Sequence, residues 1–211
     1  MKPEQSTVYI VDDDRAFRES LLFLIESAGF AARGFDSALR FLQECDPAAR
    51  GSMLLDIRMP EMTGLELLAA LPQRGIKLPV IMITGHGDVP MAVRAIKAGA
   101  FDFYEKPFND ASLLACVRRA IALDSDRHGK VLHQSAIQSR INLLTPRERQ
   151  VLEGVIEGRL NKQIAEDLKL SEKTVESHRS NLMKKMQAQN VVHLVKLVLE
   201  SNPLATAAAD Q

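Results

Sequence analysis

Leu54 to Pro60 read Leu-Leu-Asp-Ile-Arg-Met-Pro, and this stretch decides the fold of the surrounding chain. The apolar run from Met53 to Leu55 leads directly into Asp56, and Gly51 and Pro60 bound the run. A short apolar run with such boundaries predicts a buried strand that ends at a loop. A carboxylate at a strand end can act as a nucleophile, although most such residues cap helices or form turns. The function of Asp56 therefore depends on which other groups reach the same place.

Strand-like and helix-like runs alternate from Thr7 onward. Strands are expected at residues 7–11, 31–35, 53–55, 80–84 and 101–104, and helices at about 17–28, 37–43, 65–71, 89–98 and 111–123. Five such β-then-α pairs predict an α/β domain with a doubly wound parallel sheet over residues 1–123. In sheets of this kind the working groups gather at the carboxyl ends of the strands, where the strand order reverses.

Composition and charge suggest two soluble domains with different tasks. The chain has 211 residues, of which 46% are hydrophobic, and its two cysteines have no His or Cys neighbours, which favours reduced thiols. No apolar run approaches the roughly 20 residues that span a bilayer, and no signal-type segment begins the chain, so we expect a cytoplasmic protein without a membrane partner. Residues 1–128 hold 15 basic and 18 acidic side chains, whereas residues 129–200 hold 12 and 8.

Polar side chains follow four of the expected strands, namely Asp12, Asp13 and Asp14, then Asp56, Thr84 and Lys106. Clustered carboxylates need a hard cation, and Mg²⁺ suits them because it takes one or two carboxylates and keeps several waters. Thr84 and Lys106 would then contact transferred phosphoryl oxygens, with Asp56 as the attacking carboxylate. Asp14 is expected to cap the first helix instead.

Four segments together resemble the receiver domain of two-component response regulators, over residues 6 to about 123. They are Val8 to Asp14, Leu54 to Pro60, Thr84-Gly85-His86-Gly87-Asp88 and Glu105-Lys106-Pro107-Phe108. The resemblance implies the strand order 2-1-3-4-5. It also implies that Asp56 accepts a phosphoryl group from the phosphohistidine of a sensor histidine kinase, so that the chain is a phosphoacceptor and not an enzyme proper.

The same resemblance assigns the metal and phosphoryl ligands. Mg²⁺, or Mn²⁺ in its place, would bind Asp13, Asp56 and the main-chain carbonyl of Arg58, with Asp12 acting through water. Thr84 and Lys106 would contact the phosphoryl group.

Other receiver positions are implied to control the switch. Phe103 matches the aromatic switch position, and the Lys106-Pro107 bond is expected to be cis. Arg58 and His86 occupy positions that affect attack by water on the phosphoaspartate, although His86 is equally explained as an exposed loop histidine. The outer face of the helix at 89–98 would form a phosphorylation-dependent dimer surface, with core packing as the alternative for its apolar residues.

Beyond residue 123 the pattern changes to helices without strands. Residues 124–142 are polar, with Ile137 and Ile141 at helical spacing, and are expected to form a linker that either prolongs the fifth helix or begins another. Residues 143–201 predict a four-helix domain, and residues 202–211 a disordered C-terminal tail.

The helix boundaries of this second domain follow from capping residues. Thr145-Pro146-Arg147-Glu148 combines an N-cap, Pro at the first helical position and Glu at the third. Asn161 is expected to cap a helix over 162–168, and Ser171 or Glu172 to open a third helix that ends near Met186. A fourth helix follows from residue 190. Two short helices separated by a tight turn fit a helix-turn-helix.

The third helix of this domain has two distinct faces. Val175, His178, Leu182 and Met186 fall on one side, and the opposite side presents Lys173, Glu176, Ser177, Ser180 and Lys184. Lysines attract phosphates, while Glu and Ser side chains can meet base edges in the major groove. Taken alone, a solvated helix face explains such a pattern more often than a DNA-binding surface.

Three motifs resemble the LuxR/NarL-type DNA-binding domain, over about residues 141–201. They are Leu144 to Leu152, Asn161-Lys162-Gln163-Ile164-Ala165 and Lys173 to Arg179. With the receiver, the chain is similar to FixJ-type transcriptional regulators. The resemblance implies that the third helix reads promoter DNA, and the expected contacts are Lys162, Lys173, Thr174, Glu176, Ser177, Arg179, Ser180 and Lys184.

The combined resemblance implies a phosphorylation-controlled regulator, expected to activate transcription as a homodimer and to contact RNA polymerase. The alternative from another class is a phosphorelay or protein-interaction module whose helical tail binds a protein partner. A metal-dependent phosphatase that uses Asp12, Asp13 and Asp56 is the third choice, because the sequence supplies no obvious general acid.

Overall fold

Five parallel strands form one sheet in the first of the two compact units into which the chain divides, residues 1–128 and 129–211. The computed structural model describes residues 6–85 and 89–201. The strand order β2-β1-β3-β4-β5 confirms the expected doubly wound α/β fold. The strands are β1 (Thr7–Val11), β2 (Ala31–Phe35), β3 (Gly51–Asp56), β4 (Val80–Thr84) and β5 (Asp102–Glu105).

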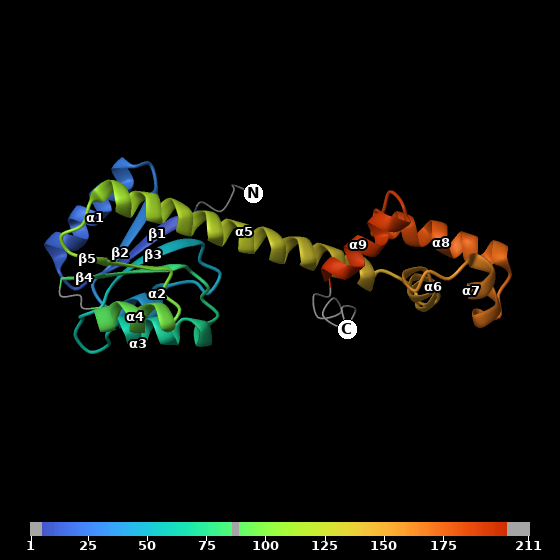
Figure 1. The fold of residues 1–211 in the computed structure, drawn as a ribbon, viewed down its shortest axis with the longest axis horizontal. Helices are drawn as coiled ribbons and strands as arrows, with labels where there is room; N and C mark the ends of the chain where they lie inside the picture. The colour runs from blue at the N-terminus through green and yellow to red at the C-terminus, as the bar shows by residue number, and fades with distance from the viewer. Residues whose placement is uncertain (1–5, 86–88, 202–211) are drawn as a thin grey trace. The chain divides into compact units, whose positions relative to one another are not determined.

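Helices cover both faces of this sheet (Figure 1). They are α1 (Arg15–Ser27), α2 (Ala38–Glu44), α3 (Gly64–Ala70), α4 (Val89–Lys97) and the first part of α5 (Asp110–Asn142), with a short 3-10 helix η1 (Pro72–Arg74) after α3. Side chains from α2, α3 and α4 pack with one face of the sheet, and side chains from α1 and α5 pack with the other. The polar ends of the central strands therefore lie between two apolar layers.

β3 lies at the centre of the sheet, and all six of its residues are buried. Met53 and Leu55 belong to the core on one face and Leu54 to the core on the other, which explains the uninterrupted apolar run. The strand begins two residues earlier than expected, because the backbones of Gly51 and Ser52 pair with β1 whatever their side chains. For the same reason β5 extends to Glu105, whose backbone pairs with Thr84.

A single helix, α5, spans residues 110–142 and so includes the whole segment 124–142. Within the first unit, Asp124 is buried with 6% of its surface exposed. Within the second unit, Ile137 is buried among the apolar side chains of the C-terminal helices. The expected linker therefore contributes a buried residue to each unit.

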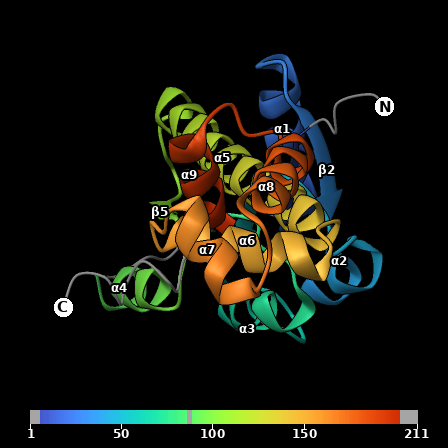
Figure 2. The same ribbon diagram turned by 90° about the vertical axis from the view of Figure 1, so that its right-hand side faces the viewer.

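In the described part of the second unit, up to residue 201, four helices follow α5, namely α6 (Pro146–Ile156), α7 (Asn161–Leu168), α8 (Glu172–Met186) and α9 (Val191–Ser201). Figure 2 turns these helices toward the viewer. Leu152 of α6, Ile164 of α7, Leu182 of α8 and Leu194 of α9 share one core. No helix within residues 6–85 and 89–201 is long and apolar enough to cross a membrane.

Most of the predicted caps are confirmed. Asp14 accepts hydrogen bonds from the first-turn amides of α1, Thr145 and Glu148 form a reciprocal capping box at α6, and Ser171 caps α8. The prediction for Asn161 was wrong, because Leu160 occupies the N-cap position and its N–H donates to Gln163 Oε1 at 2.8 Å. The Asn161 side chain instead accepts from Arg179 of α8.

Candidate functional site

Three adjacent strands end together at one edge of the sheet. Val11 of β1 is level with Leu55 of β3, and Asp56 of β3 is level with Ile83 of β4. Asp12, Asp56 and Thr84 therefore emerge side by side, and all three are buried. Lys106 follows β5 and reaches the same edge through its main chain, since its N–H donates to the Thr84 carbonyl at 2.7 Å.

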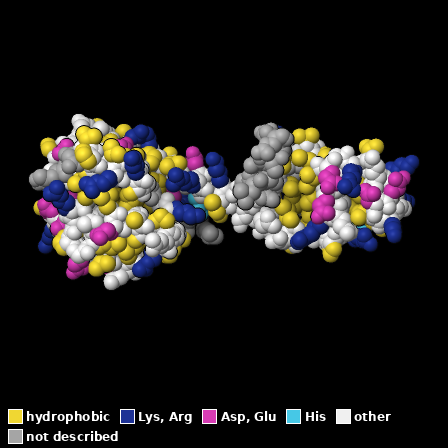
Figure 3. All heavy atoms as spheres, turned by 60° about the horizontal axis from the view of Figure 1, so that its bottom comes forward, with side chains coloured by type: hydrophobic (Ala, Val, Ile, Leu, Met, Phe, Trp, Pro, Cys, Tyr) yellow, Lys and Arg dark blue, Asp and Glu magenta, His cyan; other side chains and the backbone are white. Residues whose placement is uncertain are grey.

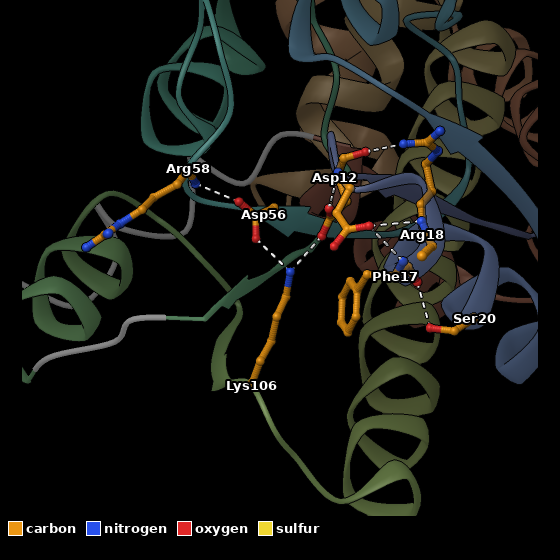
Figure 4. A network of polar contacts seen from close by, with 9 residues as sticks. Asp12, Phe17, Arg18, Ser20, Asp56, Arg58 and Lys106 are labelled. Carbon is orange, nitrogen blue, oxygen red and sulfur yellow. Dashed lines mark hydrogen bonds and ion pairs between the residues drawn. The ribbon is translucent and has the colours of Figure 1, made fainter.

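Lys106 joins the two buried carboxylates. Its ammonium donates to Asp12 Oδ2 at 2.8 Å and to Asp56 Oδ1 at 2.9 Å, as Figure 4 shows. These two ion pairs link residues that lie 94 and 50 positions apart in the chain. The structure thus brings together three of the predicted site residues.

The other oxygen of each carboxylate is held by a main-chain amide. Asp56 Oδ2 accepts from the Arg58 N–H at 2.6 Å, and Asp12 Oδ1 accepts from the Asp14 N–H at 2.9 Å. Arg18 holds the main chain of the same loop, because its guanidinium donates to the Asp12 carbonyl at 2.6 Å. Both carboxylates are therefore oriented before any ligand binds.

Burial sets the electrostatics of the site. Asp12 and Asp56 are only 2% and 6% exposed. Burial raises the pKa of Asp12, because it outweighs the hydrogen bond and charge of Lys106. Burial alone would lower the pKa of Lys106, but the hydrogen bonds and charges of Asp12 and Asp56 outweigh it and raise that pKa. The ammonium charge is consequently maintained between the two acids.

A close backbone approach fixes the loop after Asp56. A Cβ at Gly64 would lie 2.1 Å from the Asp56 carbonyl oxygen, so only glycine fits at the start of α3. The Gly64 N–H donates to the Ile57 carbonyl at 2.9 Å, and Thr63 with Glu66 forms a capping box at the same turn. This contact holds the loop that carries Arg58 against the end of β3.

The donor set fits a hard divalent cation. Asp12 and Asp56 supply two convergent carboxylates, which is the number that Mg²⁺ commonly takes from protein while it keeps several waters. Asp13 is exposed beside them. Within residues 6–85 and 89–201 no three His, Cys, Asp or Glu side chains already converge as a metal cage. Two buried, oriented carboxylates with an exposed third acid beside them fit the ligand preference of Mg²⁺.

The structure describes most of the other positions that the receiver resemblance implies. Phe103 is half-buried and packs with the core on the side of α4, and the Lys106-Pro107 bond is cis, as expected. The Arg58 side chain is exposed. His86 lies outside the described residues. The apolar face expected on α4 is partly uncovered, since Val89, Val93 and Ile96 are 77%, 45% and 49% exposed.

Two residues that contact Lys106 or the Asp12 main chain were not predicted from the sequence. Phe17 places its ring 3.7 Å from the Lys106 ammonium, and Arg18 fixes the Asp12 main chain. Both follow the Asp14 cap on the first turn of α1, a position from which side chains return toward the preceding loop. That geometry is the only feature of the sequence that points to them.

The second unit presents α8 as a candidate nucleic-acid surface. Val175, Leu182 and Met186 are buried and His178 is half-buried, which confirms the predicted packing face. The expected contact residues Lys173, Glu176, Ser177, Ser180 and Lys184 are all exposed, as is Lys162 on α7. Thr174 and Arg179 are half-buried. The outward face of α8 is therefore free of core packing along its length.

Arg179 has a partner within this unit. Its guanidinium donates to Asn161 Oδ1 at 2.6 Å and so joins α8 to the first residue of α7. Thr174 lies within hydrogen-bond distance of Ser171, with 2.7 Å between their hydroxyl oxygens. These two predicted contact residues thus help to set the geometry of the helix pair.

An ion pair fixes the other end of α8. Lys185 donates to Glu148 Oε2 at 2.7 Å and to the Leu143 carbonyl at 3.2 Å. Glu148 is 3% exposed although it also belongs to the capping box of α6. Burial would raise the pKa of Glu148, but the hydrogen bonds from Lys185 and Thr145 outweigh it and lower that pKa.

Charged side chains are distributed over both units. In the view of Figure 3, Lys and Arg side chains are scattered among acidic and hydrophobic ones on each unit. Net charge alone therefore does not distinguish a nucleic-acid surface on the second unit, whereas the exposed face of α8 has the geometry of a recognition helix.

Comparison with known proteins identifies the families of both units. Residues 8–118 match the family model of the response regulator receiver domain, and residues 142–198 match that of bacterial regulatory proteins of the luxR family. The chain is 47% identical to the transcriptional regulatory protein FixJ of Azorhizobium caulinodans over 197 residues, which are 93% of both chains. It is 45% identical to the response regulator protein TmoT of Ectopseudomonas mendocina, with 93% of this chain and 90% of TmoT covered.

Two solved structures extend these similarities along nearly the whole chain. The response regulator StyR is 43% identical with a TM-score of 0.84, over 92% of this chain and 98% of StyR. Full-length FixJ from B. japonicum is 42% identical with a TM-score of 0.58, over 96% of this chain and 100% of that structure. These matches favour a DNA-binding output over a protein-binding helical tail. The chain belongs to the FixJ-type response regulators, two-component transcriptional regulators that phosphorylation controls and that join a receiver domain to a LuxR-type DNA-binding domain.

Proposed function

We propose that Asp56 is the phosphoacceptor of this regulator. The observation that carries the proposal is the pair of contacts from Lys106 to Asp12 and Asp56 at the ends of adjacent strands. An Asp56 oxygen attacks the phosphorus of a phosphohistidine, an O–P bond forms, and the P–N bond breaks. The imidazole leaves with the electron pair of that bond. The chain acts as a phosphoacceptor and does not turn over an external substrate.

The neighbours of Asp56 have separate tasks in this step. The Lys106 ammonium and the Thr84 hydroxyl bind phosphoryl oxygens and offset their negative charge. The Arg58 N–H fixes the Asp56 carboxylate so that one oxygen faces the donor. Asp12, Asp13, Asp56 and the Arg58 carbonyl would hold Mg²⁺, with Asp12 acting through water, and the cation supplies further charge neutralisation at the phosphoryl group when it is bound.

Phosphorylation then favours a receiver conformation that dimerises, and the dimer binds DNA through its output domains. Movement of Thr84 toward the phosphoryl group lets Phe103 follow, and the exposed apolar face of α4 becomes the homodimer surface. Two recognition helices, one from each α8, bind the two halves of an inverted repeat in promoter DNA. The dimer activates transcription through contact with RNA polymerase, and its partners, a kinase phosphohistidine and chromosomal DNA, place it in the cytoplasm.

Phosphorylation with acetyl phosphate and Mg²⁺ tests the acceptor. Asp56→Asn should abolish the mass increase of one phosphoryl group, whereas Asp126→Asn, an exposed acid on α5, should leave it unchanged. Persistence of the modification in Asp56→Asn would disprove the assignment.

Footprinting of genomic fragments tests the output. We expect protection of an inverted repeat that strengthens with acetyl phosphate in the wild-type protein and not in Asp56→Asn. Equal protection by both proteins under limiting concentration would contradict phosphorylation control through Asp56.

A further inference from the structure

The Lys106 ammonium has an aromatic neighbour on the side that the carboxylates leave open. Its nitrogen lies 3.7 Å from the centroid of the Phe17 ring, and Figure 4 shows the ring beside it. A lysine ammonium within about 6 Å of a ring centroid is attracted by the negative face of the ring. Lys106 has three N–H donors, of which two bond to Asp12 and Asp56. The Lys106 ammonium is therefore held by two carboxylates and by the face of the Phe17 ring.

The ring of Phe17 is itself fixed from two sides. The Phe17 N–H donates to the Asp14 side chain at 3.2 Å, so the helix cap holds the backbone. The ring packs edge-to-face on Phe108, with centroids 6.1 Å apart and an angle of 76° between the ring planes. Phe108 packs in the same manner on Tyr104 at 6.0 Å. Phe17 is thus one end of an aromatic row that is anchored to α1 and to the segment after β5.

The carboxylates that bind Lys106 take part in phosphoryl transfer, whereas the Phe17 ring does not. In the proposed phosphoryl transfer an Asp56 oxygen forms a bond to phosphorus, and Asp12 would also bind a water of the Mg²⁺ ion. Both partners of Lys106 therefore acquire competing ligands, whereas a phenyl ring has no oxygen with which to bind a metal or phosphorus. The attraction between Lys106 and Phe17 persists while the ion pairs loosen.

We propose that Phe17 is a positioning residue for phosphoryl transfer, whose ring face holds the Lys106 ammonium at Asp56 as the carboxylates take up other ligands. The proposal rests on the proposed role of Asp56. A residue that holds a charged group in its reactive position lowers the barrier of the chemical step. Loss of the ring should therefore slow phosphorylation without abolishing it.

Acetyl phosphate provides a direct assay of this step. An Asp56 oxygen bonds to phosphorus, the bond from phosphorus to the acetyl oxygen breaks, and acetate leaves with its electron pair. Phe17→Leu keeps an apolar side chain but removes the ring face, and should slow the reaction by about threefold to thirtyfold. Phe17→Trp should restore the rate, since its ring attracts cations most strongly. Phe23→Leu on the same helix, where Phe23 is 74% exposed, is the matched control and should react as wild type.

Fluorinated phenylalanines separate the electrostatic attraction of the ring face from the packing of the ring. One, two or three fluorines at position 17 weaken the negative ring face stepwise at nearly constant size, so the rate of phosphorylation should fall stepwise.

Proton NMR gives a second readout, because protons above a ring face shift upfield. The ε-methylene protons of Lys106 should be shifted upfield both before and after phosphorylation, and Phe17→Leu should remove the shift.

The outcomes are decisive in either direction. Equal rates across the fluorinated series, or a wild-type rate for Phe17→Leu, would overturn the proposal, as would loss of the upfield shift on phosphorylation. If Leu and Trp variants are equally slow while the fluorinated series is flat, Phe17 only fills space and the proposal also fails. Asp56→Asn run in parallel distinguishes the two claims. Phosphorylation of that variant would refute the acceptor, whereas a phosphorylated wild type with no dependence on Phe17 would refute the positioning role alone.

Discussion

Asp124 of α5 forms a buried ion pair with Arg50, the residue before β3. Arg50 Nε donates to Asp124 Oδ2 at 2.8 Å, and the same oxygen accepts from the Gly51 N–H at 3.0 Å. The two side chains are 15% and 8% exposed. The contact fixes α5 to the amino end of β3, the strand whose other end carries Asp56.

Asp124→Asn should destabilise the first unit. The substitution removes the charge that pairs with Arg50 and weakens the bond to the Gly51 amide, which predicts a loss of about 1–3 kcal/mol. Tyrosine fluorescence during urea unfolding measures this unit selectively, because the chain has no Trp and its two Tyr residues, Tyr9 and Tyr104, both belong to it. Asp126→Asn, an exposed acid two residues later, should change the unfolding free energy by less than about 0.5 kcal/mol. Equal effects of the two substitutions would show that the ion pair does not stabilise the unit.

Sequence reasoning reached the groups that are near a strand end or a helix cap. Asp12, Asp56, Thr84 and Lys106 were found because parallel strands deliver their carboxyl ends to one edge. The capping box at Thr145 was found because its residues are three positions apart.

Contacts without a local pattern were missed. Asp124 was expected in a linker because its neighbours are polar, yet it pairs with a residue 74 positions away. The contact of Phe17 with Lys106 was not predicted, because nothing in helical spacing places its ring over Lys106. Asn161 was expected to cap a helix, but Arg179 competes for its side chain from another helix. Such side-chain partners are set by the tertiary fold, which brings distant segments together.

Gly64→Ala should disturb the Asp56 loop through its backbone. The new Cβ would clash with the Asp56 carbonyl oxygen, 2.1 Å away, so α3 must shift from the end of β3. We expect a loss of about 1–3 kcal/mol in urea unfolding by tyrosine fluorescence, together with slower phosphorylation by acetyl phosphate. Gly129→Ala within α5, where a Cβ meets no atom within 4 Å, should cause no loss of stability. A fully stable and normally phosphorylated Gly64→Ala protein would contradict the role of this contact.

Glu148→Gln should destabilise the second unit in a pH-dependent way. Because the pKa of Glu148 is lower in the folded state than its ordinary value, the carboxylate contributes stability above an unfolded-state pKa of about 4.3. That contribution is lost as pH falls through the lowered folded-state pKa. At pH 7 the substitution should cost about 1–3 kcal/mol by breaking the bond to Lys185.

Hydrogen exchange of the α6 and α8 amides, compared between about pH 7 and pH 4, measures this effect once the intrinsic exchange rates are divided out. The difference between wild type and Glu148→Gln should be constant near neutral pH and should shrink at acid pH. Glu153→Gln, exposed on the same helix, is the control and should show no such difference. A Glu148→Gln effect that does not decrease at acid pH would mean that shape, not charge, accounts for the stabilisation.

Lys173→Ala should weaken DNA binding through loss of a phosphate contact. Lys173 is exposed at the start of α8, on the face opposite the buried Val175. A lysine that neutralises one phosphate releases about one counterion, so the slope of log affinity against log salt should become shallower by about 1, with similar losses on specific and nonspecific DNA.

Glu176→Gln should instead change the preference among operator sequences, because a carboxylate accepts from cytosine N4 whereas an amide can also bond adenine. Fluorescence anisotropy with promoter and competitor duplexes across a salt series measures both effects. Lys130→Ala, exposed on α5, should leave the slope unchanged, and an unchanged slope for Lys173→Ala as well would exclude its contact with the DNA backbone.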